Sequence, residues 1–157
     1  MNLLAELLIV MKNCGSTFEY TKERDDDIMR AYMELVKEGD TIQLDNIFKR
    51  IVNMPSKRFW VSAERASIVV SRIMRGDKLD KMLPTKREMF FEIHRRVMEL
   101  KKKYPEMSIY ELTLQVVQEP SPKFYITTGS AKVMIYKAKK RWYSEQRKRL
   151  QRLLPKQ

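Results

Sequence analysis

An internal repeat is the feature of this sequence that most constrains its fold. Shifted by 65 residues, the chain aligns with itself without a gap. The match is densest between residues 52–62 and 117–127, where Val, Pro, Ser and Phe recur and Arg/Lys, Trp/Tyr, Val/Ile and Ser/Thr replace one another. Self-similarity at one register indicates a duplicated supersecondary unit. The sequence therefore predicts one repeat over residues 20–78, a connector over 79–84 and a second repeat over 85–142.

Each repeat is predicted to contain three helices. In the first repeat, apolar residues follow the i, i+3, i+4, i+7 spacing of one helix face at Ala66, Val69, Val70 and Ile73. Ser108 followed by Glu111 is a capping-box pattern that marks the start of a helix in the second repeat. The predicted helices cover about 21–38, 42–52, 63–75, 86–103, 108–118 and 129–142. The expected fold class is all-α, with two tandem three-helix repeats of helix-turn-helix type, a short N-terminal helix in residues 1–19 and a basic C-terminal helix or tail in residues 143–157.

The repeated block between the second and third helices combines a helix-breaking proline with aromatic and β-branched residues. The proline ends the second helix, and the residues after it favour an extended run. Phe59 and Phe124 are expected to be buried in equivalent places, beneath the three helices of their own repeats. Arg58 and Lys123 have no obvious role in a core, so they are predicted to be functional.

The charge of the chain is strongly positive and unevenly distributed. There are 32 Lys and Arg against 20 Asp and Glu, which gives a net charge of +12. Residues 85–142 carry +7 and residues 143–157 carry +4. A gradient of this kind indicates a polyanion that is contacted mainly by the second half of the chain. Nucleic acid, with DNA favoured over RNA, is the expected partner.

The third helix of each repeat carries basic residues outside and aliphatic residues inside, as recognition helices do. Arginine can bond base edges, whereas lysine mostly neutralises phosphate. Sequence preference is therefore expected from Arg65, Arg72 and Arg75, and general affinity from the second repeat and the tail. The candidate nucleic-acid-binding residues are Arg58, Arg65, Arg72, Arg75, Lys123, Lys132, Lys137, Lys139, Lys140, Arg141, Arg147, Lys148 and Arg149.

In the order and length of its helices, the region from residue 20 to residue 142 resembles the tandem three-helix repeats of Myb-like and homeodomain-like DNA-binding proteins. This resemblance implies a helix-turn-helix fold whose third helices enter DNA. The Pro-Ser-x-Arg-Phe-x-Val-Ser block, residues 55–62, is also similar to one in small proteins of phages and mobile elements. That second resemblance implies no particular function.

The composition provides few of the residue types that enzymes use for catalysis. The chain has one His, one Cys and four Gly. It lacks a Ser-His-Asp set, a phosphate-binding glycine loop and any Cys/His metal spacing. No enzyme activity, cofactor or metal is expected, nor any small-molecule substrate. Because His94 aligns with Met29 of the first repeat, it is expected to be semi-buried rather than catalytic.

The N-terminus and the single cysteine bear on location. Residues 1–12 are apolar but contain Glu6, lack a basic start and have no small-residue cleavage site, so neither a signal peptide nor a membrane span is expected. With Cys14 alone, no internal disulfide can form, and a reducing, cytoplasmic location is expected, either with the nucleoid or inside a phage-like particle. The apolar N-terminus could pair with a second copy or with another protein.

Three functional hypotheses remain open at this point. The first is a double-stranded DNA binder, either a regulator or an accessory factor of a phage or mobile element. The second is a structural or packaging component of a phage-like particle. The third is an RNA-binding protein, which would prefer folded or single-stranded RNA.

Overall fold

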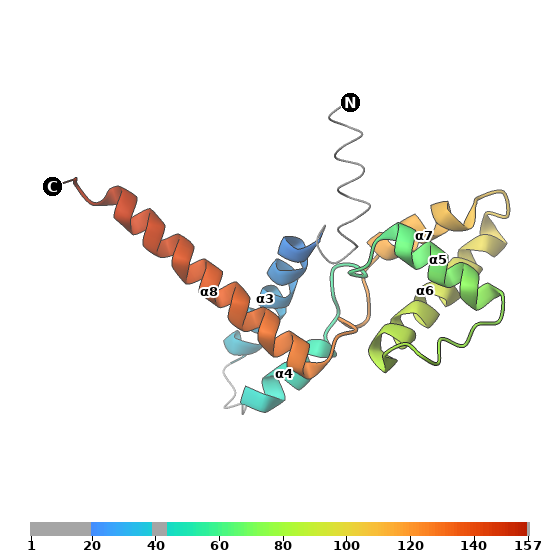
Figure 1. Cartoon of the computed structure of the whole chain (residues 1–157), viewed down its shortest axis with the longest axis horizontal. Coiled ribbons are helices and arrows are strands. Elements are labelled where there is room, and N and C mark those ends of the chain that lie inside the picture. Colours follow the sequence, from blue (N-terminus) through green and yellow to red (C-terminus); the bar gives the residue numbers. More distant parts are fainter. Residues whose placement is uncertain (1–19, 39–43, 157) are drawn as a thin grey trace.

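The computed structural model of the protein describes residues 20–38 and 44–156, and this part of the chain is all-helical. The predicted all-α class is therefore confirmed, while the helix predicted within residues 1–19 lies outside the described residues. Figure 1 shows the helices in chain order, which are α3 (Thr21–Lys37), α4 (Leu44–Val52), α5 (Ala63–Met74), α6 (Pro84–Lys103), α7 (Ile109–Gln118) and α8 (Thr128–Leu153). Between the described residues there is one isolated antiparallel bridge and no named strand.

The helix starts follow local signals that are visible in the sequence. Ser62 caps α5 by accepting a hydrogen bond from the backbone N–H of Arg65, and Thr127 caps α8 in the same way. At the start of α7, Ser108 and Glu111 form the predicted capping box. Such caps satisfy backbone donors that the first turn of a helix leaves without partners.

The packing does not group the helices by repeat. One bundle consists of α3, α4 and α8, and the other of α5, α6 and α7. Figure 1 shows these two groups on either side of a central crossing. Each bundle thus combines the first two helices of one repeat with the third helix of the other. The prediction that each repeat packs as its own consecutive three-helix unit is corrected by this exchange.

The exchange results from the long connections between second and third helices. Residues 53–62 and 118–127 do not turn back on their own helices but run past one another. Ser56 and Ser121, which are equivalent positions, each donate a backbone N–H to the other's carbonyl at 3.0 Å. Phe59 N–H donates to Val117 O at 3.0 Å, and the equivalent bond from Phe124 N–H to Val52 O measures 3.2 Å. Because each of these backbone bonds has its counterpart, the crossing has approximate twofold symmetry.

The two cores confirm that both phenylalanines are buried, but each lies with helices of the other repeat. Phe59 belongs to the core of the α5–α6–α7 bundle, where its ring stacks on Tyr125 at a centroid distance of 6.0 Å. Phe124 belongs to the core of the α3–α4–α8 bundle. The crossing segments therefore anchor the exchanged helices by placing one large apolar side chain in each bundle.

An acidic residue of α3 holds the crossing segment in place. Asp27 is buried and accepts hydrogen bonds from the backbone N–H of Lys57 at 2.9 Å and from Trp60 Nε1 at 3.1 Å. Arg30 donates to the same carboxylate and also to the carbonyl of Pro55. Buried carboxylates are tolerated when they are paired in this way.

Candidate nucleic-acid interface

Helix α8 extends well beyond the bundle that it helps to form. Its 26 residues span about 39 Å at the usual helical rise. Ala131 and Ile135 are buried against α3 and α4, whereas nearly every residue from Lys140 onward is exposed. Residues 140–153, called the arm below, project away from the body in Figure 1. The predicted boundary at residue 142 is corrected, because the helix continues through the expected tail to Leu153.

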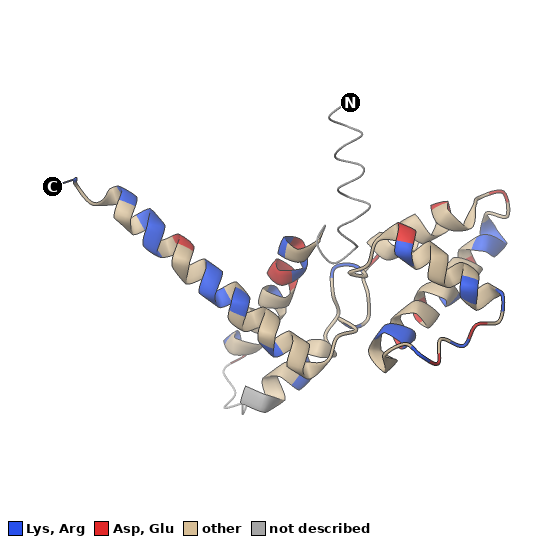
Figure 2. Cartoon of the chain, viewed as in Figure 1, with Lys and Arg blue, Asp and Glu red and all other residues tan. Residues whose placement is uncertain are grey.

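Positive charge covers α8 (Figure 2). The helix contains nine Lys or Arg residues and one acidic residue, Glu145. A helix without compensating acids concentrates a positive potential along its length. On α6 the situation differs, because Arg95 and Arg96 are paired with Glu92 at 2.7 Å and 2.9 Å. Both helices contain many basic residues. They differ because α8 carries more positive charge that no acidic residue neutralises.

The structure divides the candidate residues of α8 into two sets. Two of them have partners on α3. Lys139 Nζ donates to Tyr32 Oη at 2.7 Å and lies over its ring, and Arg141 forms an ion pair with Asp25. The others are exposed and have no side-chain partner among the described residues, and they are Lys132, Lys137, Lys140, Arg147, Lys148 and Arg149. The second set is available for phosphate.

The candidates on α5 are also unequal. Arg65 is exposed, and so is Arg75, whose Nε donates to the carbonyl of Ser71 at 3.3 Å. Arg72 instead pairs with Asp77, with Nη2 and Nε at 2.7 Å and 2.9 Å from Oδ2. Binding a base edge would require Arg72 to give up this pair, whereas Arg65 and Arg75 keep their guanidinium groups accessible.

Arg58 and Lys123 have structural partners that the sequence did not indicate. The Arg58 guanidinium lies 4.2 Å from the centroid of the Tyr20 ring and donates to the carbonyls of Phe59 and Val61. Lys123 Nζ lies 2.5 Å from Glu88 Oε1. Arg58 lies outside both cores, as expected, but its cation–π contact and its backbone bonds brace the crossing.

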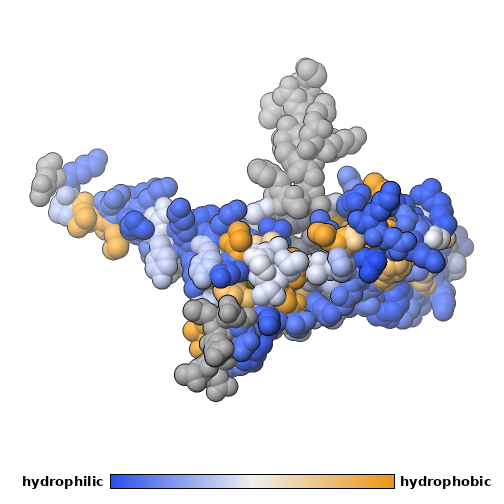
Figure 3. All heavy atoms as spheres, turned by 60° about the horizontal axis from the view of Figure 1, so that its bottom comes forward, coloured by the Kyte–Doolittle hydropathy of each residue, from blue (hydrophilic) through white to orange (hydrophobic). Residues whose placement is uncertain are grey.

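Two features of α8 and its surroundings were not predicted from the sequence. First, Leu150, Leu153 and Leu154 are 63%, 81% and 66% exposed, and Figure 3 shows hydrophobic atoms gathered near the outer end of the arm. The spacing of these leucines on one helix was a usable signal for this surface. Second, Arg24 and Asp25 lie against α8. Only the fold brings these two residues beside Lys137, more than 100 positions away.

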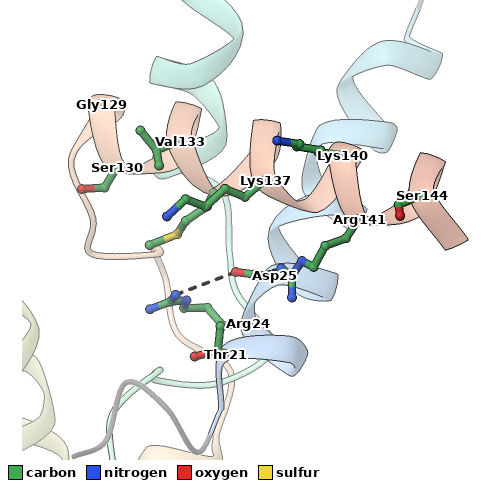
Figure 4. A pocket seen from close by; sticks show the side chains of 11 residues that line it. Thr21, Arg24, Asp25, Gly129, Ser130, Val133, Lys137, Lys140, Arg141 and Ser144 are labelled. Atoms are coloured by element: carbon green, nitrogen blue, oxygen red, sulfur yellow. Dashed lines mark hydrogen bonds and ion pairs between the residues drawn. The ribbon is translucent and has the colours of Figure 1, made fainter.

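A groove lies between the start of α3 and α8, with a volume of about 860 Å³. Figure 4 shows its lining side chains, which include basic residues from both helices. Arg24 and Asp25 come from α3, while Lys137, Lys140 and Arg141 come from α8. The groove is thus continuous with the basic surface of the arm.

The described part of the chain was also compared with the expectations for His94, for metal ligands and for membrane spans. His94 is semi-buried, as expected, and burial lowers its pKa. Across residues 20–38 and 44–156, no group of three His, Cys, Asp or Glu residues could hold a metal ion. The same residues contain no helix with the length and apolar character needed to cross a membrane.

Comparisons with known proteins gave no match, whether to family models, to curated proteins or to solved structures. The candidate interface therefore depends on the residues and geometry given above.

Proposed function

We propose that this protein binds nucleic acid, with DNA as the preferred partner and RNA as the alternative. The observation that carries the proposal is α8, a helix of about 39 Å with nine basic residues, one acid and seven exposed cations that lack side-chain partners among the described residues. Sequence-independent affinity for nucleic acid arises when such cations displace condensed counterions from phosphates.

Helical geometry favours DNA over RNA. The major groove of B-DNA admits an α-helix, whereas the major groove of A-form RNA is too narrow for side chains to read. In this proposal the arm neutralises phosphates, and the exposed Arg65 and Arg75 on α5 supply sequence preference. Arg72 contributes less than expected from sequence, because its guanidinium is engaged by Asp77.

Fluorescence anisotropy with a labelled random-sequence duplex tests this proposal. Replacing Lys140 and Lys148 by Ala should weaken binding to every duplex and flatten the dependence on salt, since each lost phosphate contact removes about 0.9 from the log–log slope. Arg95→Ala is the matched control, because Arg95 is exposed and basic but paired with Glu92 and Glu99. Absence of binding at low salt, or equal effects of the two changes, would refute the proposal.

A second candidate function is a structural or packaging component of a phage-like particle. The exposed leucines at the end of the arm favour it, because nucleic-acid binding leaves them unexplained and exposed apolar patches often mark protein contacts. In that case Leu150→Gln with Leu153→Gln, which removes apolar surface without changing the charge of the arm, should abolish assembly with particle subunits while leaving duplex affinity within about threefold.

A further inference from the structure

The groove between α3 and α8 has the size of a small-molecule site. Its volume of about 860 Å³ falls within the range of roughly 300–1,000 Å³ that is typical of such sites. Charged residues line one part of the groove, and Val133 and Met134 provide an apolar part. The groove can therefore accept a ligand that combines charge with an apolar ring or sugar.

Four cations and a single carboxylate line this groove. Asp25 is the only carboxylate among the lining residues, and it is buried and paired with Arg141. Arg24 Nη2 lies 3.8 Å from Asp25 Oδ1, which is too long for a hydrogen bond, and Arg24 Nε is buried without a partner among the described residues. Lys137 likewise has no carboxylate partner there. Figure 4 shows the ends of Arg24 and Lys137 on the same side of the groove.

The equivalent place in the other bundle lacks this chemistry. Shifting Arg24 and Asp25 by 65 residues gives Met89 and Phe90, which are buried core residues. Lys137 corresponds to Arg72, whose charge is neutralised by Asp77. The connector also places Leu79 and Met82 at that groove. That groove is lined by Arg65, Lys81 and Lys86 as well, but also by Asp77 and Asp80, so the excess of cations over acids is larger on the α3–α8 side.

We propose that this groove binds the terminal phosphate and terminal nucleotide of a nucleic-acid strand, an inference that rests on the proposed function. A terminal phosphomonoester carries about −1.5 to −2 charges at pH 7, whereas an internal phosphodiester carries one. Arg24 and Lys137 match the larger charge. Val133 and Met134 contact the base or sugar.

Three hairpin duplexes of one sequence, labelled in the loop, provide the test. One carries a 5′-phosphate, one a 3′-phosphate and one neither, so that the source of the phosphate is distinguished. Wild-type protein should bind one phosphorylated hairpin about tenfold more tightly than the unphosphorylated one, as one charge-assisted contact requires. Lys137→Gln and Arg24→Gln should each reduce this ratio to less than about twofold.

Lys148→Gln is the matched control, because Lys148 lies on the same helix but outside the groove. It should weaken all three hairpins and keep the ratio. Lys137 is exposed, so Lys137→Gln should fold normally and decides the outcome even if Arg24→Gln is unstable. Equal affinity of wild-type protein for all hairpins, or a ratio that survives Lys137→Gln, overturns this inference and leaves the proposed function standing. Failure to bind any hairpin overturns both.

Discussion

The third helices of the two repeats begin alike and end very differently. Both α5 and α8 start after a capping hydroxyl, and both bury small and aliphatic residues at equivalent places, Ala66 and Ala131 among them. However, α5 has 12 residues and ends at Met74, whereas α8 has 26 and continues to Leu153. The shared half of the helix completes a bundle, so the additional half of α8 is free to serve another purpose.

The residues that follow Met74 explain the early end of α5. Gly76 has a φ of +96°, a left-handed conformation that ends helices and that glycine adopts without strain. Asp77 then accepts the backbone N–H of Leu79 at 2.8 Å and binds Arg72, which directs Leu79 into the core. The equivalent positions in α8 hold Arg141 and Trp142, which continue the helix. One repeat thus closes with an acidic turn, while the other extends as a basic arm.

The largest expected effect tests the exchange of helices between repeats. Phe59→Ala should lower the free energy of unfolding by about 3–5 kcal/mol, because a large buried ring is lost from the core. Since Phe59 packs with α6 and α7, the accelerated hydrogen exchange should appear at Ile93 and Val116 rather than at Ile28. Urea denaturation and amide exchange measured by NMR provide the two readouts.

Phe124→Ala should produce the converse pattern, with loosening confined to α3, α4 and α8. Phe91→Ala is the control, because this ring is 39% exposed and its loss should cost about 0.5 kcal/mol or less. Faster exchange in α3 and α4 upon Phe59→Ala would mean that the repeats fold without exchange.

An effect of intermediate size concerns the difference in charge between α5 and α8. Replacing Arg147, Lys148 and Arg149 by Ala should make the salt dependence of duplex binding shallower by about 2.7 on the log–log scale, if each contacts one phosphate. Replacing Arg65 and Arg75 should change that slope less and reduce discrimination between duplexes more. Titrations between 50 and 200 mM salt measure both quantities. Indistinguishable slopes for the two variants would contradict the division of roles between α5 and α8.

The sequence was sufficient for the repeat, the approximate helix bounds and the burial of Phe59 and Phe124. Helical periodicity reports which residues are apolar, and this is a local property. It does not report which bundle an apolar face joins, so the exchange of α5 and α8 could not be read from it. The crossing depends on hydrogen bonds between residues 65 positions apart, such as those of Ser56 and Ser121.

The candidate site, like the fold, was predictable only where its features are local in the sequence. The basic run of α8 is contiguous, so its cations were found from sequence. The partners that occupy Arg58 and Arg141 come from Tyr20 and Asp25, which only the fold brings near. The Arg72–Asp77 pair is local, but it depends on the turn at Gly76, whose geometry the predicted helix over residues 63–75 did not specify.

The smallest effect that we expect concerns this turn at the end of α5. The hydrogen bond from the Leu79 N–H, together with Arg72, lowers the pKa of Asp77 below its ordinary value. The ionised carboxylate is therefore favoured in the folded protein, so its stabilising contribution is present above about pH 3.9, the usual aspartate pKa, and is lost as the pH falls through the lowered value. Amide exchange of Gly76 and Leu79 should accelerate in that acidic range, while the arm of α8, which lacks an equivalent acid, should not change with it.

Asp77→Asn should reproduce this local loosening at neutral pH, because the charge that binds Arg72 is removed while the shape of the side chain is kept. Asp80→Asn is the matched control, since Asp80 lies in the same connector, is exposed and has no hydrogen bond or ion pair among the described residues. The urea midpoint should change little in either variant, because exposed ion pairs contribute little to global stability. If Asp77→Asn left the exchange of Leu79 unchanged, the acidic turn would not be what ends α5, and the glycine at position 76 would have to suffice by itself.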